Sequence, residues 1–376
     1  MVKKVISTPA QSLNISEDTR SFSDILDQSS AKLKKYSGDR LLPKYEVKKM
    51  AEGLLTRLLH RVDLYTDSLR LNEMFELLDS KQKDAFSRRL IYSCVTRAYA
   101  GLIDLVGDYN EDESDSIGLT DGWVEDPKAW EKLTSGEAKE YEGEMVKVRG
   151  ESYVPANRPV GREKQTVAFV PSEKKSSFDV ATEIFKRYLA KRKNENCFDC
   201  ATATQVISFA AEALTLGRLD FDAKYLDGTR SRLQVALTTT FSIINGDFVQ
   251  GAFYRHFVRE LKVGRDIGLE SQLEVGDIVY FENHSNYEEL APKGAWAGEW
   301  AVVADVEMKD GEGVPKFKGF GVSGFVGAED MGAHLQEEFD RVADGADGLG
   351  PERTKTLDDR WPGISVVYRP KLLVDV

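Results

Sequence analysis

Two cysteines, Cys197 and Cys200, lie three positions apart near the middle of the chain. A cysteine acts as a nucleophile when its thiol is ionised, and the N–H groups in the first turn of a helix stabilise the thiolate. Apolar residues recur at helical spacing from Ala203 to Leu214, so we expect a buried helix that begins near Cys200. Cys200 is therefore the better candidate nucleophile, and the alternative is a cysteine simply buried in a helix.

The same pair also forms a C-x-x-C motif, which leaves a redox or metal role open. A thioredoxin-like site would need a preceding strand, whereas residues 176–192 have the pattern of an amphipathic helix. The third cysteine, Cys94, lies on the apolar face of a predicted helix, and we expect it in the core. The three cysteines cannot form a disulfide framework and the four histidines are scattered, so we expect no metal and no other cofactor.

Two carboxylates are candidates to assist the thiol. Asp199 directly precedes the predicted helix, where it can cap the helix or act as a catalytic base. Glu299 begins a predicted strand in which Glu299, Ala301 and Val303 share one face. It belongs either to a site or to a solvent-exposed strand end. His284 follows another predicted strand, and it either reaches the site or lies on the surface.

The first 110 residues have helical patterns. Apolar positions recur at helical spacing from Val47, just after Pro43, and again from Phe86, after an N-cap at Asp79 or Ser80. An acidic Gly- and Ser-containing stretch follows at 107–122. We therefore expect an all-α region at 1–110 and an acidic loop with an irregular connecting segment at 111–175, in which a few short strands occur.

The elements after residue 176 predict an α+β domain that folds as one unit over 176–376. A helix carries the candidate nucleophile at its N-terminus and ends at Gly217. Antiparallel strands follow it along the chain, with one helix among them. The expected strands are 275–283, 298–306, 316–324 and 362–369, and the expected helix is 329–342.

Composition sets the broad class of protein. Of the 376 residues, 41% are hydrophobic and 30% are charged, as in a globular protein. No apolar stretch approaches the roughly 20 residues of a membrane helix, and no apolar region follows the N-terminal lysines, so we expect neither a membrane span nor a Sec signal. The chain would act in the cytoplasm or leave by a signal-independent route. A net charge of −12 argues against nucleic acid as a partner and mildly favours cationic proteins.

Several segments resemble, in order, the bacterial spore-coat type of protein-glutamine gamma-glutamyltransferase, a transglutaminase. Phe198-Asp199-Cys200-Ala201-Thr202-Ala203 resembles the nucleophile motif of that family. GDIVYFEN at 276–283, the Trp296-Ala297-Gly298-Glu299 segment and Phe320-Gly321 resemble three of its later segments, and the resemblance covers about 176–370. It implies a papain-like fold of the NlpC/P60 type, with the nucleophile at the N-terminus of a helix packed on an antiparallel sheet.

The resemblance also implies roles for residues. Cys200 would be the nucleophile and Glu299 its partner, while Asp199 stands where the family has Glu and Lys318 where it has His. The aromatic residues beside these positions, Phe198, Trp296 and Trp300, are candidates to wall a substrate slot for a lysine stem, or else pack in the core.

The activity that the resemblance implies is isopeptide-bond formation between glutamine and lysine side chains of protein substrates, through a cysteine thioester. A cysteine hydrolase of the same fold remains open, as a protein-glutamine deamidase or a cell-wall peptidase or amidase. So does an inactive binding module. The N-terminal helical region is a candidate delivery, inhibitory or partner-binding region, as in a secreted effector.

Overall fold

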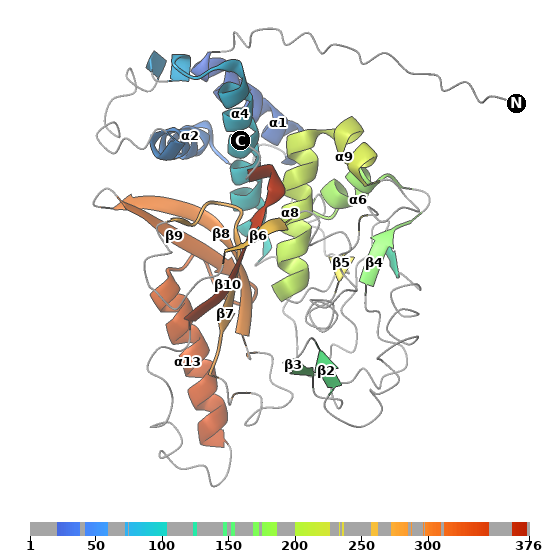
Figure 1. Cartoon of the computed structure of the whole chain (residues 1–376), viewed down its shortest axis with the longest axis vertical. Helices are drawn as coiled ribbons and strands as arrows, with labels where there is room; N and C mark the ends of the chain where they lie inside the picture. Colours follow the sequence, from blue (N-terminus) through green and yellow to red (C-terminus); the bar gives the residue numbers. More distant parts are fainter. Residues whose placement is uncertain are drawn as a thin grey trace, which may run out of the picture.

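The computed structural model describes residues 21–37, 42–58, 72–73, 75–103, 123–125, 146–148, 152–154, 168–172, 175–185, 200–225, 233, 235–236, 257–261, 272–284, 287, 296, 298–309, 312–345 and 363–373. In these ranges, helices pack on a curled antiparallel sheet, so the fold is α+β as expected (Figure 1).

The described residues of the N-terminal part include the helices α1 (Phe22–Ser37), α2 (Lys44–Leu58) and α4 (Ser80–Ala100). The start of α4 is fixed by a capping box. The Asp79 carboxylate accepts the backbone N–H of Gln82 at 2.8 Å, and the Gln82 side-chain oxygen accepts the backbone N–H of Asp79 at 3.0 Å. The predicted N-cap and the helical character of this region are confirmed within the described residues.

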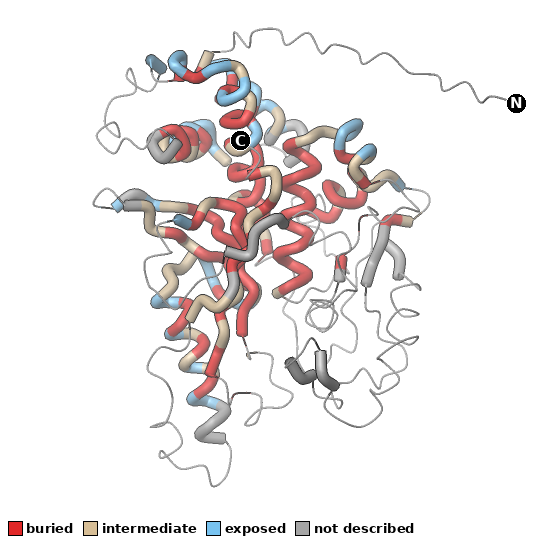
Figure 2. Tube along the Cα trace, viewed as in Figure 1, coloured by how far each residue is buried: buried red, intermediate tan, exposed pale blue. Residues whose placement is uncertain are grey.

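The helix α8 (Cys200–Leu216) lies at the centre of the molecule. All its residues from Ala201 to Thr215 are buried, which is typical of a helix that is covered on every side (Figure 2). It ends before Gly217, whose φ of 85° is readily adopted only by glycine, and α9 (Arg218–Lys224) follows. The predicted buried helix and its end at Gly217 are therefore confirmed, and the described part of this helix begins at Cys200.

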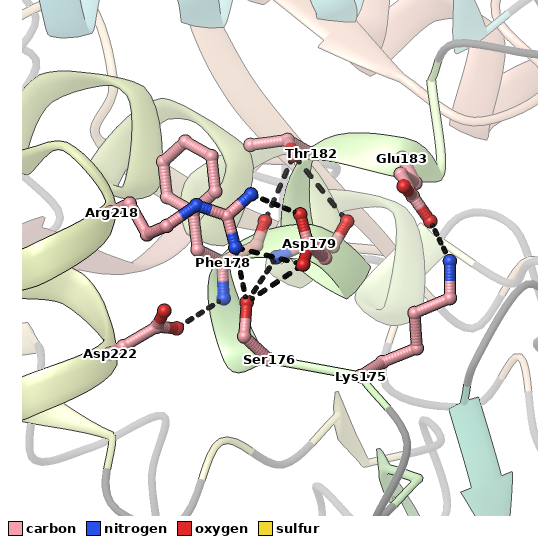
Figure 3. Close-up of polar contacts among 8 residues, drawn as sticks. All are labelled: Lys175, Ser176, Phe178, Asp179, Thr182, Glu183, Arg218 and Asp222. Atoms are coloured by element: carbon pink, nitrogen blue, oxygen red, sulfur yellow. Dashed lines mark hydrogen bonds and ion pairs between the residues drawn. The ribbon is translucent and has the colours of Figure 1, made fainter.

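A short helix, α6 (Ser177–Glu183), is fastened to α9 by polar contacts (Figure 3). The Arg218 guanidinium donates to the Asp179 carboxylate, with Nη1 2.8 Å from Oδ2, and lies 4.9 Å from the centroid of the Phe178 ring. The Asp222 carboxylate accepts the backbone N–H of Phe178 at 2.8 Å. These contacts fix the segment that precedes α8 to the segment that follows it.

The main sheet has the order β6-β10-β7-β8-β9, and every described pair of neighbours is antiparallel. Its strands are β6 (Phe257–Leu261), β7 (Ile278–Glu282), β8 (Gly298–Lys309), β9 (Glu312–Gly319) and β10 (Gly363–Pro370). The helix α13 (Ala328–Gly345) follows β9, and the short 3-10 helix η9 (Lys371–Leu373) follows β10.

Shorter strands form two smaller sheets. One has the order β1-β4-β5 and the other pairs β2 with β3. The strands are β1 (Trp123–Glu125), β2 (Val146–Val148), β3 (Ser152–Val154), β4 (Ala168–Pro171) and β5 (Val235–Ala236). Short strands were expected in the connecting segment, and β1 to β4 lie there.

The main sheet is covered on both faces. Trp300, Val302 and Ala304 of β8 belong to a buried cluster with residues of α4 and α8. The alternate residues Ala301 and Val303 belong to a second buried cluster, which contains residues of α13. We call these two sides of the sheet the α8 face and the α13 face. Alternate residues of β8 belong to different clusters because successive side chains of a strand point to opposite faces of the sheet.

The first buried cluster crosses the predicted domain boundary. It joins residues of α1, α2 and α4 to residues of α6, α8, α9 and the sheet. Tyr99 of α4 stacks on Phe185 with ring centroids 4.2 Å apart, and Arg97 of α4 forms an ion pair with Asp305 of β8. The division into 1–110, 111–175 and 176–376 therefore describes the sequence pattern, while the described part of 1–110 shares its core with the C-terminal half.

Two predicted elements differ from the observed ones. The strand expected at 316–324 ends at Gly319, because Gly321 and Gly324 turn the chain with φ values of 84° and 73°. The helix expected at 176–192 ends at Glu183, and residues 186–199 lie outside the described ranges. No helix of the described residues is long and apolar enough to cross a membrane.

Candidate active site around Cys200

Cys200 is the first residue of α8, and it is half-buried against the first cluster. The first-turn amides of a helix have no acceptor within the helix, and the helix dipole places partial positive charge there. This is a favourable position for a thiolate. The first turn is fixed by two side chains: Thr204 Oγ1 and Gln205 Nε2 donate to the Ala201 carbonyl at 2.9 and 3.0 Å.

Cys94 is a different kind of cysteine. It is fully buried in α4, and its sulfur lies 3.8 Å from the sulfur of Met50. Burial raises the pKa of the Cys94 thiol to about 12, although the charge of Arg97 opposes this shift. The expectation that Cys94 is a core residue is confirmed. Cys200 is thus the more accessible of the two cysteines in the described ranges.

Three predicted residues of this region lie outside the described residues. They are Cys197, Phe198 and Asp199. The predicted cap or base role of Asp199 and the predicted wall role of Phe198 therefore stay predictions.

Glu299 lies at the start of β8 and is buried, with 3% of its surface exposed. Its Oε1 accepts the backbone N–H of Phe320 at 2.5 Å. A side chain at Gly319 would clash with it, because a Cβ there would lie 2.7 Å from the same oxygen. The carboxylate therefore ties the start of β8 to the end of β9.

Glu299 and Cys200 belong to different faces of the sheet. Glu299 pairs with Phe281 across β7 and β8, and Phe281 belongs to the cluster on the α13 face. Cys200 packs against the cluster on the α8 face. The structure thus buries Glu299, and it assigns Glu299 and Cys200 to clusters on different faces of the sheet.

The two tryptophans also lie on different faces. Trp300 is buried on the α8 face, with its ring centroid 4.8 Å from that of Tyr280 and 5.8 Å from that of Tyr368. Trp296 packs against the second cluster, and its ring meets that of His334 at 4.7 Å. The proposed slot cannot be formed by both of them on one side of the sheet, since β8 separates the two rings.

His284 is buried on the α13 side, contrary to a surface position. Its Nε2 lies 2.6 Å from Gln336 Oε1, and its ring packs on Phe339 with centroids 4.5 Å apart. Both partners belong to α13, so His284 helps to fasten that helix. The neighbouring Asn283 side chain donates to the carbonyls of Trp296 and Leu335 at 2.8 and 3.0 Å.

Lys318 is a buried charge on the α8 face. It pairs with Val302 across β8 and β9, so its side chain leaves the sheet on the side of α8. It has 2% of its surface exposed, and its Nζ donates to the carbonyl of Val322. The sequence indicated Lys318 only through the resemblance, and it did not single out Gly319. A glycine within a strand often marks close approach of another group, and that signal could have identified Gly319.

Asp277 and Glu212 are two further buried ionic groups, and both have partners. Asp277 receives two bonds from Arg369, Nε–Oδ1 at 2.9 Å and Nη2–Oδ2 at 2.7 Å. Glu212 of α8 accepts from the Tyr225 hydroxyl and from Lys224, and burial together with this carboxylate raises the pKa of Tyr225. No group of three or more His, Cys, Asp or Glu residues in the described ranges is placed to hold a metal ion.

Comparison with protein-family models, with curated proteins and with solved structures finds no match for this chain.

Proposed function

We propose that the chain is a cysteine acyltransferase with a papain-like catalytic arrangement, and that it forms isopeptide bonds between glutamine and lysine side chains of proteins. The position of Cys200 is the observation that supports this most. It is a half-buried thiol in the first turn of a buried helix that packs on an antiparallel sheet. The ordered resemblance of 176–370 to the transglutaminase segments supports the substrate class.

In the proposed reaction, the Cys200 thiolate attacks the γ-carboxamide carbon of a glutamine. A C–S bond forms, the C–N bond breaks, and ammonia leaves with a proton from water. A neutral lysine amine then attacks the thioester, the C–S bond breaks, and the amine proton returns to the solvent. N–H groups at the start of α8 are candidate donors to the oxyanion. Because the amine must be neutral, the transfer should favour alkaline pH.

The resemblance assigns proton transfer to Glu299. That carboxylate accepts the Phe320 N–H, and its strand partner Phe281 belongs to the cluster on the α13 face. We therefore base the proposal on Cys200 and propose that Glu299 positions the β8–β9 connection. Mutation of Glu299 can establish whether it forms a catalytic dyad with Cys200.

A cysteine hydrolase is the second candidate function. It shares the acyl-enzyme and differs in that water, rather than an amine, resolves the thioester. One observation favours it: Trp296 and Trp300 lie on different faces, so the two side chains do not form one slot for a lysine stem. A deamidase or a cell-wall amidase would need no such slot.

The N-terminal helices bear on the proposed partners. Protein substrates remain the proposed partners of the site. A role of residues 1–110 in delivery or partner binding, as in a secreted effector, would have to use their outer surface, because their apolar faces are occupied by the shared core.

Mass spectrometry of a glutamine-rich protein incubated with the full chain tests the proposal. With a labelled primary amine, transfer adds the mass of the amine minus ammonia. A gain of about one mass unit that is independent of amine concentration would instead indicate deamidation. Cleavage of muropeptides with no change in any protein would indicate a cell-wall hydrolase, and no reaction with any of these substrates would favour a binding module. The Cys200→Ala variant is the matched control.

A further inference from the structure

We propose that Thr204 and Gln205 are positioning residues of the nucleophile. Through their shared acceptor, the Ala201 carbonyl, they strengthen the stabilisation that the first turn of α8 gives to the Cys200 thiolate. The inference rests on the proposed function only in taking Cys200 as the nucleophile. Both side chains act on the thiol through the backbone, without touching the substrate.

The two side chains converge on the peptide unit next to the nucleophile. Thr204 Oγ1 and Gln205 Nε2 lie 2.9 and 3.0 Å from the Ala201 carbonyl oxygen, and Ala201 directly follows Cys200. In an α-helix the backbone N–H of Gln205 donates to this same carbonyl. The Ala201 carbonyl is thus held by side-chain donors in addition to the bond that the helix itself supplies.

These bonds polarise a first-turn amide. The Ala201 carbonyl and the Thr202 N–H belong to one planar peptide unit. Thr202 is the third residue of α8, so this N–H points toward the start of the helix, where Cys200 lies. Hydrogen bonds in a chain strengthen one another by about 10–30%. The side-chain donors therefore increase the partial positive charge that the first turn presents to the thiolate.

The same bonds hold the first turn together. Helix ends fray, and a frayed first turn would lose the aligned N–H groups that stabilise a thiolate there. Gln205 and Thr204 are buried, with 0% and 3% of their surfaces exposed, so solvent does not compete for their donors. The first turn can thus keep its geometry while the half-buried Cys200 exchanges its thiol proton.

The stability of α8 does not explain these bonds. Methionine would fill the place of Gln205 without burial of an amide, which costs free energy. A threonine hydroxyl that donates back to a helix carbonyl slightly weakens the helix. A role in the reactivity of the adjacent cysteine gives both donors a reason to meet at Ala201.

The opposite end of α8 offers a matched control. Thr215 Oγ1 donates to the Ala211 carbonyl at 2.7 Å, and Thr215 is buried, with 6% of its surface exposed. Its bond is of the same kind as that of Thr204, but it lies in the last turn of the helix. If Thr204 only satisfied its own hydroxyl, removal of either hydroxyl would have the same effect on Cys200.

Charged side chains on the elements around α8 are the same in every variant compared. They are Arg97 of α4, Asp179 and Glu183 of α6, Lys224 of α9, Glu299 and Asp305 of β8, and Lys318 of β9. A difference between two pH profiles therefore reports the change made in α8 itself.

The test is the pH dependence of Cys200 alkylation by iodoacetamide in the full chain, followed by peptide mass spectrometry. A Cys197→Ser background leaves one thiol in the peptide that contains Cys200, and the buried Cys94 reports any unfolding. In the double variant Thr204→Val, Gln205→Met, we expect the midpoint to rise by roughly 0.2–0.7 pH units, the size of a helix-terminus effect. Well below the midpoint, alkylation should be about two- to fivefold slower, because the thiolate is the reactive form.

Two single variants complete the comparison. Thr204→Ser keeps the hydroxyl and should keep most of the midpoint of the parent protein. Thr215→Val removes a hydroxyl at the other end of α8 and should leave the midpoint unchanged. Urea unfolding of Thr204→Val and Thr215→Val should show similar losses of stability, so that a general loosening of α8 does not produce the difference.

An unchanged midpoint in a folded double variant would overturn the inference, and so would an equal rise in Thr215→Val. If the double variant does not fold, Thr204→Val decides alone, because valine keeps the shape of threonine, and its midpoint must then exceed that of Thr215→Val. Failure of Thr204→Val itself to fold would assign Thr204 to the stability of the helix and overturn the inference. The proposed function can fail separately: a raised midpoint in the double variant, with no acyl transfer by the parent protein, would keep this effect and reject the transferase.

Discussion

The Glu299 carboxylate occupies the space that a side chain at position 319 would need. A Cβ on Gly319 would lie 2.7 Å from Glu299 Oε1 and 2.8 Å from Glu299 Cγ. Both residues are buried between the sheet and α13, and the same oxygen accepts the backbone N–H of Phe320 at 2.5 Å. The glycine, the carboxylate and the amide therefore form one packed unit at the end of β9.

The first prediction concerns this fit. Gly319→Ala should lower the free energy of unfolding by about 1–3 kcal/mol, as expected for overpacking in a buried site. Gly53→Ala is the matched control, because Gly53 lies inside α2 and a Cβ there would meet nothing within 4 Å. That change should be neutral or stabilise by up to about 1 kcal/mol through helix propensity. Urea unfolding measures the free energy of unfolding of both variants and of the parent protein. Equal stability of the two variants would contradict the packing argument.

Glu299 itself can be tested for a positioning or a catalytic role. Glu299→Gln keeps an oxygen that can accept the Phe320 N–H, so the variant should fold normally and lose less than tenfold in kcat. Glu299→Ala leaves that buried amide without its acceptor and should cost about 1–3 kcal/mol of stability. A kcat loss of about 100-fold or more in a normally folded Gln variant would instead establish Glu299 as the general base that the resemblance implies.

The sequence predicted the elements well where the local signals were strong. The capping box at Asp79, the helix from Cys200 and its end at Gly217 follow from capping chemistry and from apolar periodicity. The resemblance singled out Glu299, which the structure buries, but a motif in sequence does not state which face of the sheet a residue occupies. That depends on the register of β7, β8 and β9, which long-range pairing decides.

Local sequence patterns also did not predict that the N-terminal helices share one buried core with the C-terminal half. An acidic stretch at 107–122 looks like a boundary, yet helices on its two sides pack together because each has a wide apolar surface to cover. Lys318 was noticed only by its place in the resemblance. Its burial follows from β9 being covered on the α8 face, and periodicity in a short strand does not reveal cover on both faces.

The identity of the nucleophile gives the next prediction. Cys200→Ala should abolish acyl transfer or hydrolysis, because no thioester can form. Cys197→Ala should keep most of the activity, since Cys200 is the cysteine that the structure places in the first turn of α8. Initial rates with the glutamine-donor protein check both variants. If the two variants lost activity equally, or if only Cys197→Ala were inactive, the assignment of Cys200 would fail.

The shared core predicts the outcome of truncation. A fragment that begins near residue 170 loses α1, α2 and α4, and with them the buried partners of α8 such as Tyr92 and Tyr99. It should therefore lack a cooperative unfolding transition and expose apolar surface, in contrast to the unit at 176–376 that the sequence pattern indicated. Circular dichroism during urea unfolding compares it with the full chain. A cooperative transition in the fragment would show that α8 and the sheet close a core without α4.

The polar contacts between α6 and α9 predict how the stability of the fold changes with pH (Figure 3). Hydrogen bonds from Arg218, and a smaller one from Ser176, lower the pKa of Asp179. A carboxyl group whose pKa is lower in the folded than in the unfolded protein stabilises the fold above its unfolded value of about 3.9. That contribution is lost as the pH falls through the folded value.

Arg218→Met removes the main cause of that lowered pKa. The variant should therefore be less stable than the parent at pH 5 to 6. The difference should narrow as the pH falls from about 4 toward the lowered folded pKa of Asp179, because the parent loses the contribution of the ionised carboxylate there. A pH-independent remainder should persist from the lost packing of the guanidinium on Phe178. Arg88→Met is the matched control, because Arg88 pairs with Asp84 on the exposed face of α4 with half of each side chain exposed. Such a pair contributes little, so that variant should follow the parent at every pH. The test is the urea midpoint of the parent and both variants from pH 3 to 6. A constant difference between the parent and Arg218→Met across that range would show that the pKa of Asp179 does not depend on Arg218.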